Sequence, residues 1–188
     1  GISNAVRNGL RTFARANGIS FYAIRNQVGV LRNLIIRTTS TGQTMVIVQF
    51  GENDPESISK VMTFLKETFP EITSLLYVIN TKGNETFHDL DLVTFSGLPY
   101  IEEQMEELRF RIGPKSFYQT NSDQAYELYK VVRDFAQLQG DEVVYDLYTG
   151  TGTIANFVAK QAKQVIGVEY VAAAIEDADN NPDHAPEL

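Results

Sequence analysis

The sequence predicts an α/β protein: an α+β part with a mostly antiparallel sheet, then the first strand–helix–strand unit of a parallel α/β domain. Three observations at residues 143–170 carry the second half of this prediction. Residues 143–148 form a short apolar run rich in β-branched and aromatic residues, typical of a buried strand. Thr149-Gly-Thr-Gly152 follows, and residues 153–162 have the apolar spacing of a helix. Residues 164–170 form a second apolar run that contains an acid, Glu169.

The turn between the first strand and the helix has the properties of a nucleotide-binding loop. Gly150 and Gly152 allow a tight turn and let a ligand approach the backbone closely, which a Cβ would block. The start of the helix presents free N–H groups and the positive end of the helix dipole. Glu169, at the end of the second strand, is placed to accept both hydroxyls of a ribose.

Asp146 distinguishes between two classes of nucleotide. The stretch from Gly150 to Ala155 also fits the dinucleotide fingerprint G-x-G-x-x-G/A, so an NAD-dependent oxidoreductase fragment is one alternative. Asp146 lies four residues before the first glycine, where its carboxylate would repel a pyrophosphate and attract a cation. S-adenosylmethionine carries a sulfonium and an ammonium group and no phosphate. We therefore predict S-adenosylmethionine as the cofactor, with Asp146 among the residues that bind it.

Composition excludes several classes of protein. The chain has 188 residues, of which 43% are apolar, so a packed core is expected. No uncharged apolar run reaches the length of about 18 residues that a membrane span needs, and no signal peptide is visible. With no cysteine there are no disulfides and no thiolate metal sites. His88 has no second metal ligand at suitable spacing. We expect a cytoplasmic protein without a metal site.

Charge is distributed unevenly along the chain. The net charge of −8 by itself argues against nucleic acid, but residues 1–50 contain six arginines and no lysine, aspartate or glutamate. Arg7, Arg11 and Arg15 recur every four residues along one flank of a predicted helix at residues 3–17. This stripe is either a solvated face or a surface that contacts phosphates. An RNA-binding module without catalysis is therefore a further alternative.

The order of predicted elements places two helices and several strands before residue 115. The first helix is expected to be capped by Ser3 or Asn4 and followed by Gly18. A second helix begins after Asp54, with Pro55 at its first position, and a third begins after Asn121 and runs to Gly140. The predicted strands are 19–24, 30–38 and 43–50 as an antiparallel meander, then 72–80, 90–95 and 108–112. We place a domain boundary between residues 115 and 116, with an RNA-facing α+β domain at 1–115 and the nucleotide-binding domain at 116–188.

Three stretches resemble the RNA (uracil-5-)-methyltransferase family. They are Arg109 to Asn121, with its F-x-Q-x-N element, Val144 to Gly152, and Val165 to Glu169. The resemblance covers about residues 1–175 and implies the end of a central domain followed by the start of a Rossmann-like, S-adenosylmethionine-dependent methyltransferase domain. It also implies which residues would contact the cofactor, with Phe117 near the target base. The implied cofactor contacts are Gln119, Tyr148, Thr153 and Glu169, with Gly150 and Gly152 as the floor.

The chemistry implied by the resemblance is methyl transfer to C5 of a uracil in tRNA or rRNA. In this family a cysteine thiolate adds to C6 of the base, which makes C5 nucleophilic enough to take the methyl group. The chain has no cysteine, so we assign it no catalytic residue. We expect a fragment of the enzyme that holds part of the cofactor site, contacts RNA through Arg7, Arg11 and Arg15, and is inactive alone.

Overall fold

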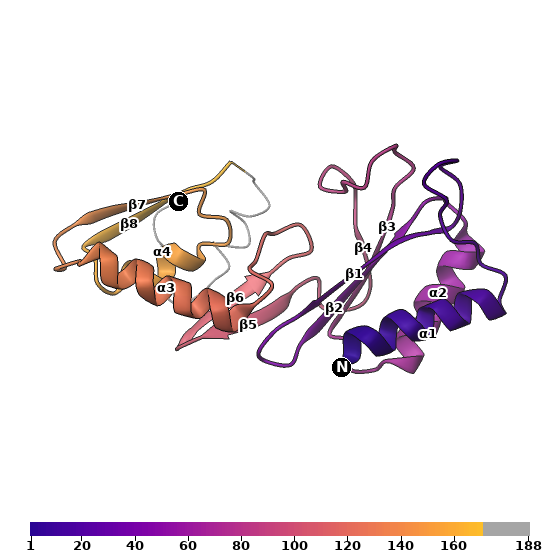
Figure 1. Ribbon diagram of the computed structural model, residues 1–188, viewed down its shortest axis with the longest axis horizontal. Coiled ribbons are helices and arrows are strands. Elements are labelled where there is room, and N and C mark those ends of the chain that lie inside the picture. Colours follow the sequence, from indigo (N-terminus) through magenta and orange to yellow (C-terminus); the bar gives the residue numbers. More distant parts are fainter. Residues whose placement is uncertain (171–188) are drawn as a thin grey trace. The chain divides into compact units, whose positions relative to one another are not determined.

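The computed structural model describes residues 1–170, which divide by their contacts into two compact units (Figure 1). The first unit comprises residues 1–38 and 43–99, and the second comprises residues 39–42 together with the chain from residue 100 onward. Within residues 1–170, no helix is long and apolar enough to cross a membrane. Residues 171–188, which complete the second predicted domain, lie outside the described part.

The first unit is a four-stranded sheet with two helices. Its elements are α1 (Ile2–Ala16), β1 (Leu31–Thr38), β2 (Thr44–Phe50), α2 (Pro55–Thr68), β3 (Ser74–Ile79) and β4 (Val93–Gly97). The strand order is β1-β2-β3-β4; β2 and β3 are parallel, and the other two pairs are antiparallel. The mostly antiparallel α+β prediction is confirmed. The predicted meander is wrong in one strand: residues 19–24 make only isolated bridges, since Phe21 and Ala23 each pair at a single position.

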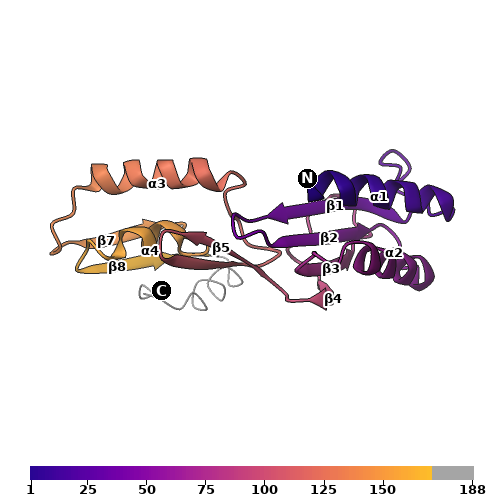
Figure 2. The same cartoon turned by 90° about the horizontal axis from the view of Figure 1, so that it is seen from below.

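Helices α1 and α2 lie beside the strands of the first unit (Figure 2). Both helices contribute side chains to one apolar core. Val6, Leu10 and Ala14 of α1 are buried at the spacing of one helical face. Gly9 brings α1 close to α2, because a Cβ there would lie 2.9 Å from the ring of Phe69. Most of the remaining core comes from α2 and from the same face of the sheet: Val46, Val48, Phe50, Ile58, Val61, Met62, Leu65 and Leu75.

The predicted N-cap residue is confirmed for two of the three helices for which a cap was predicted. Asp54 Oδ1 accepts from the N–H of Glu56 and of Ser57 at the start of α2, and Asn121 accepts from the Gln124 N–H at the start of α3. At α1 the prediction is wrong, because Gly1 is the N-cap and makes no side-chain capping bond. The third helix also ends earlier than predicted, at Ala136, since Gln137 adopts a left-handed conformation with φ +47°.

The described part of the second unit, which ends at residue 170, contains a hairpin, two helices and a parallel pair of strands. Its elements are β5 (Ile101–Met105), β6 (Leu108–Ile112), α3 (Ser122–Ala136), β7 (Val143–Leu147), α4 (Thr153–Ala159) and β8 (Gln164–Val168). Strands β5 and β6 pair antiparallel. Strands β7 and β8 pair parallel, and α4 lies between them in the sequence. Strand β5 was not predicted. The hairpin packs Met105, Leu108 and Phe110 against α3 and α4, so the division by contacts falls at residue 99/100. The boundary at 115/116 stays a prediction.

The strands β7 and β8 are less buried than predicted. On β7 the side chains of Tyr145 and Leu147 are 63% and 62% exposed, while the opposite face packs on α4 through Val144, Val165 and Val158. The apolar runs predicted strands buried on both sides. In the described part of the chain, the helices cover only one face of this pair, so alternate side chains face outward.

Glu103 of β5 is a buried carboxylate that fixes the turn at residues 39–42. Both of its oxygens accept the Ser40 N–H at 3.1 Å, and it accepts the Ser40 hydroxyl and, at 2.5 Å, the Ser122 hydroxyl. Its side chain is fully buried, and these four hydrogen bonds compensate its desolvation. Sequence reasoning gave this residue no role, because the partners lie far away along the chain.

Candidate functional site

The turn between β7 and α4 is folded by three residues in the left-handed region. Their φ angles are +63° at Tyr148, +59° at Gly150 and +75° at Gly152. Only glycine adopts this region freely, so both glycines are required here, and Tyr148 is held there against its own preference. The N–H groups of Tyr148 and Thr149 donate to the Val168 carbonyl at 2.8 and 3.1 Å, which ties the turn to the end of β8.

Asp146 locks this turn onto the first turn of α4. Its Oδ2 accepts the Thr149 hydroxyl at 2.7 Å and the Ala155 N–H at 3.0 Å. Gly152 is the N-cap of α4 and has no side chain to cap it, so the neighbouring strand supplies the acceptor instead. This places a negative charge at the positive end of the helix dipole. A pyrophosphate at the same position would meet a carboxylate and an N–H group that is already bonded.

Glu169 closes the other side of the turn. Its Oε2 accepts the Gly150 N–H at 2.8 Å, and its Oε1 accepts the Tyr170 N–H at 2.8 Å. Two acidic residues from adjacent parallel strands therefore converge on one glycine turn.

Gly150 leaves open space beside the turn. A Cβ built at this position meets no heavy atom within 4 Å, so the surface over the turn is bare backbone. The rest of the turn is packed from below: the hydroxyls of Thr151 and Thr153 are 3.0 Å apart and buried, and Asn156 Nδ2 donates to the Gly152 carbonyl at 2.8 Å. Thr153 was predicted to contact a ligand, yet its side chain is only 6% exposed. Three polar residues that stabilise the turn were not predicted: Thr149, Thr151 and Asn156. The sequence signal that could have identified one of them is the polar Asn156 on the apolar side of a short predicted helix.

The structure thus brings Asp146, Tyr148, Gly150, Gly152, Thr153 and Glu169 together. Phe117 and Gln119 lie on the segment between β6 and α3, both exposed, and within residues 1–170 no hydrogen bond links either to the turn. Between them the chain turns inward at Tyr118, whose pKa is raised by burial and by the nearby Glu103 carboxylate. Burial also raises the pKa of Tyr129 on α3, and Asp146 adds to that shift.

Arg7, Arg11 and Arg15 lie on α1 in the first unit, and all three are exposed. Arg7 and Arg11 line a hollow between α1 and β1, while Arg15 does not. The six predicted residues at the β7–α4 turn and these arginines belong to different units.

Comparison with known proteins shows which proteins this chain is similar to. No protein-family model matches the chain. An RNA methyltransferase of Bacteroides thetaiotaomicron, itself uncharacterized, is 58% identical over 183 residues, covering 96% of this chain and 40% of that protein. An uncharacterized RNA methyltransferase of Porphyromonas gingivalis is 60% identical over 161 residues, covering 86% of this chain and 35% of that protein.

A solved structure shows the same fold with a ligand. It is the tRNA (uracil-54, C5)-methyltransferase of Pyrococcus abyssi in complex with S-adenosyl-L-homocysteine, with a TM-score of 0.74 and 26% identity. The match covers 93% of this chain and 42% of that one. The fold is therefore that of S-adenosylmethionine-dependent methyltransferases, as predicted. The chain is similar in sequence to proteins named RNA methyltransferases and spans about 40% of the length of the curated relatives it matches.

Proposed function

We propose that this chain carries part of the S-adenosylmethionine site of an RNA methyltransferase. The observation that carries the proposal is the convergence of Asp146 and Glu169 on the bare Gly150 turn. The carboxylates suit a ligand with positive charge and ribose hydroxyls, and the missing Cβ leaves room for close approach. The Pyrococcus abyssi relative, bound to S-adenosyl-L-homocysteine, supports the same cofactor.

Each residue of the turn has a proposed role. The Glu169 carboxylate would accept hydrogen bonds from the ribose hydroxyls, and Asp146 would attract the cationic end of the cofactor while holding the turn on α4. Tyr148, which is 88% exposed, and Gln119 would supply side-chain contacts. Gly150 and Gly152 would form the floor. Thr153 would act through its buried bond to Thr151.

We further propose that the whole protein transfers the methyl group to C5 of uracil in RNA. The cofactor supplies an electrophilic methyl group, which needs a nucleophilic carbon in the substrate. C5 of uracil becomes nucleophilic only when a thiolate adds at C6, and this chain contains no cysteine. Its 188 residues would therefore hold cofactor and contact RNA without turnover. Arg7, Arg11 and Arg15 would contact RNA phosphates, and Phe117 would lie near the target base.

Calorimetric titration with S-adenosylhomocysteine and with NADH tests the cofactor. We expect binding of S-adenosylhomocysteine alone, because the Asp146 carboxylate occupies the helix N-terminus that a pyrophosphate would need. Binding of NADH alone would replace the proposal by the oxidoreductase alternative. Binding of RNA with no binding of either cofactor would favour the alternative that the chain is an RNA-binding module without catalysis. Methyl incorporation into RNA by this chain would refute the proposed lack of turnover.

A further inference from the structure

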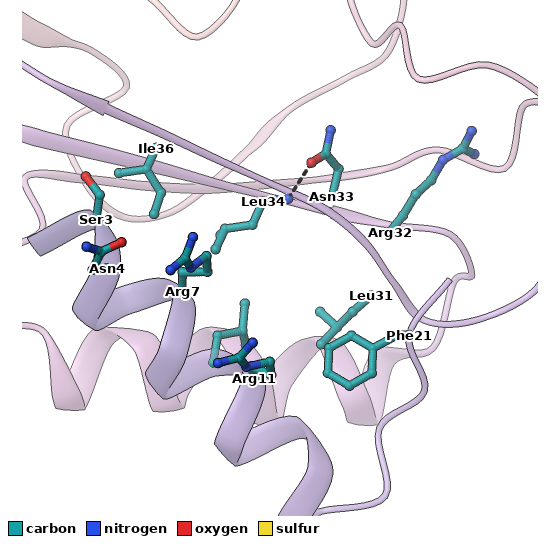
Figure 3. Close-up of a pocket in the computed structure, with 11 residues that line it drawn as sticks. Ser3, Asn4, Arg7, Arg11, Phe21, Leu31, Arg32, Asn33, Leu34 and Ile36 are labelled. Atoms are coloured by element: carbon teal, nitrogen blue, oxygen red, sulfur yellow. Dashed lines mark hydrogen bonds between the residues drawn. The ribbon is translucent and has the colours of Figure 1, made fainter. Parts of the chain in front are cut away.

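A hollow of about 460 Å³ lies between α1 and β1 in the first unit (Figure 3). Its floor is apolar and comes from Leu31, Leu34 and Ile36 of β1. These three share a face because the ladder with β2 is irregular between Leu31 and Asn33, which leaves Arg32 as an extra residue. The hollow has a volume within the range of small-ligand sites, about 300–1,000 Å³.

The wall formed by α1 is positively charged. Arg7 and Arg11 extend from successive turns of the helix over this floor, as Figure 3 shows. Arg11 donates to Asn8 at 3.2 Å, and neither arginine forms an ion pair with any residue of the described part. Among residues 1–170, none of those that line the hollow is acidic. The charge is thus available to an anion from outside.

Arg32 also borders the hollow, but its guanidinium is hydrogen-bonded to groups outside it. Its guanidinium donates to the carbonyls of Asn80, Lys82 and Asn84 at 2.6–2.7 Å and lies 4.5 Å from the ring centroid of Tyr22. Figure 3 shows its side chain directed away from Arg7 and Arg11. Arg7 and Arg11 are therefore the cations that this hollow offers to a ligand.

Phe21 provides an aromatic surface at one end of the hollow. Its ring lies beside Leu31 in Figure 3 and is 47% exposed, although Phe21 is a large apolar residue. An exposed aromatic ring next to arginines, over an apolar floor, is the combination on which an unpaired base stacks while its phosphate is bound. A purely anionic ligand would make no use of this floor.

We propose that the hollow between α1 and β1 binds one unpaired nucleotide of an RNA. The base stacks on Phe21 and covers Leu31 and Leu34, and Arg7 and Arg11 hold the adjoining phosphates. This inference rests on the proposed RNA substrate and gives it a defined contact. It requires single-stranded RNA, because a paired base cannot leave the helical stack without cost.

Fluorescence anisotropy with a short labelled single-stranded RNA tests the proposal across a series of salt concentrations. Replacing both arginines (R7Q/R11Q) should reduce the log–log salt slope by about 1.4, since each phosphate contact of a single strand contributes about 0.7. The charge-matched control K60Q/K66Q changes two exposed lysines of α2 that do not line the hollow and should leave the slope unchanged. Equal changes in both variants would overturn the proposal.

Phe21 gives a second test that does not depend on charge. F21L should weaken RNA binding roughly tenfold, whereas F21Y, which keeps the ring, should bind as wild type does. RNA containing 4-thiouridine should crosslink to Phe21 or its neighbours on irradiation. A duplex of the same sequence binding equally well, or no binding of RNA by the wild-type chain, would overturn the nucleotide site. Binding of S-adenosylhomocysteine is measured separately, so failure of the hollow and failure of the cofactor proposal are distinguishable.

Discussion

Replacing Gly150 by alanine tests whether the turn at this position binds the cofactor or is an ordinary glycine turn. Gly150 has φ +59° and open space where a Cβ would lie, so G150A is expected to strain the backbone without a clash in the free protein. The left-handed conformation costs an alanine roughly 1–2 kcal/mol, and the stiffer unfolded chain offsets part of this cost. Gly18, with φ +67° and equally open space, provides a matched control in the other unit.

We expect G150A and G18A to lose similar stability, about 1 kcal/mol each, in urea unfolding. Their affinities for S-adenosylhomocysteine should differ. In G150A the new methyl group would occupy space that the cofactor needs, at a cost of about 2 kcal/mol, which is about thirtyfold in Kd. G18A should bind as wild type does in isothermal titration calorimetry. Unchanged affinity in G150A would refute the assignment of Gly150 as the floor of the cofactor site.

Three further perturbations test other parts of the second unit. E169Q keeps an acceptor for the Gly150 N–H but weakens the two proposed charged hydrogen bonds to the ribose. The Kd for S-adenosylhomocysteine should therefore rise about thirtyfold. The control E127Q, which changes an exposed glutamate of α3, should leave the Kd unchanged. E103A removes the buried carboxylate that accepts hydrogen bonds from Ser40 and Ser122, and it should cost about 3 kcal/mol in urea unfolding. A loss below that of an exposed Glu→Ala variant would contradict the role of Glu103. Hydrogen bonds from the Arg133 guanidinium lower the pKa of Glu106, so this pair stabilises the fold above the ordinary carboxyl pKa and loses that effect as pH falls through the lowered value. The stability difference between wild type and R133Q should therefore shrink in acid, and a difference independent of pH would exclude this linkage.

Much of the cofactor turn could be predicted from the sequence because its signals are local. Gly150 and Gly152 are required by backbone conformations within a few residues, and Asp146 and Glu169 each lie at the end of an apolar run. The strand–glycine turn–helix–strand order follows from the same short stretch. The caps of α2 and α3 were likewise predictable, since an N-cap side chain bonds to a backbone group two or three residues away.

Other features depend on contacts between residues far apart in the sequence. The sequence indicated that Asp146 attracts a ligand, but only the fold showed that it also caps α4 from a neighbouring strand. Parallel pairing of β2 with β3 is decided by the packing of α2, and a local alternation of residues cannot distinguish it from a meander.

The sequence by itself determined the turn chemistry, the helix caps and the acid-free arginine segment at residues 1–50. Tertiary structure alone decided that Arg7 and Arg11 line a hollow with Phe21 whereas Arg32 is bound to backbone carbonyls. The physical reason is that conformational preference acts over a few residues, while burial and hydrogen-bond partners are set by residues that folding brings together.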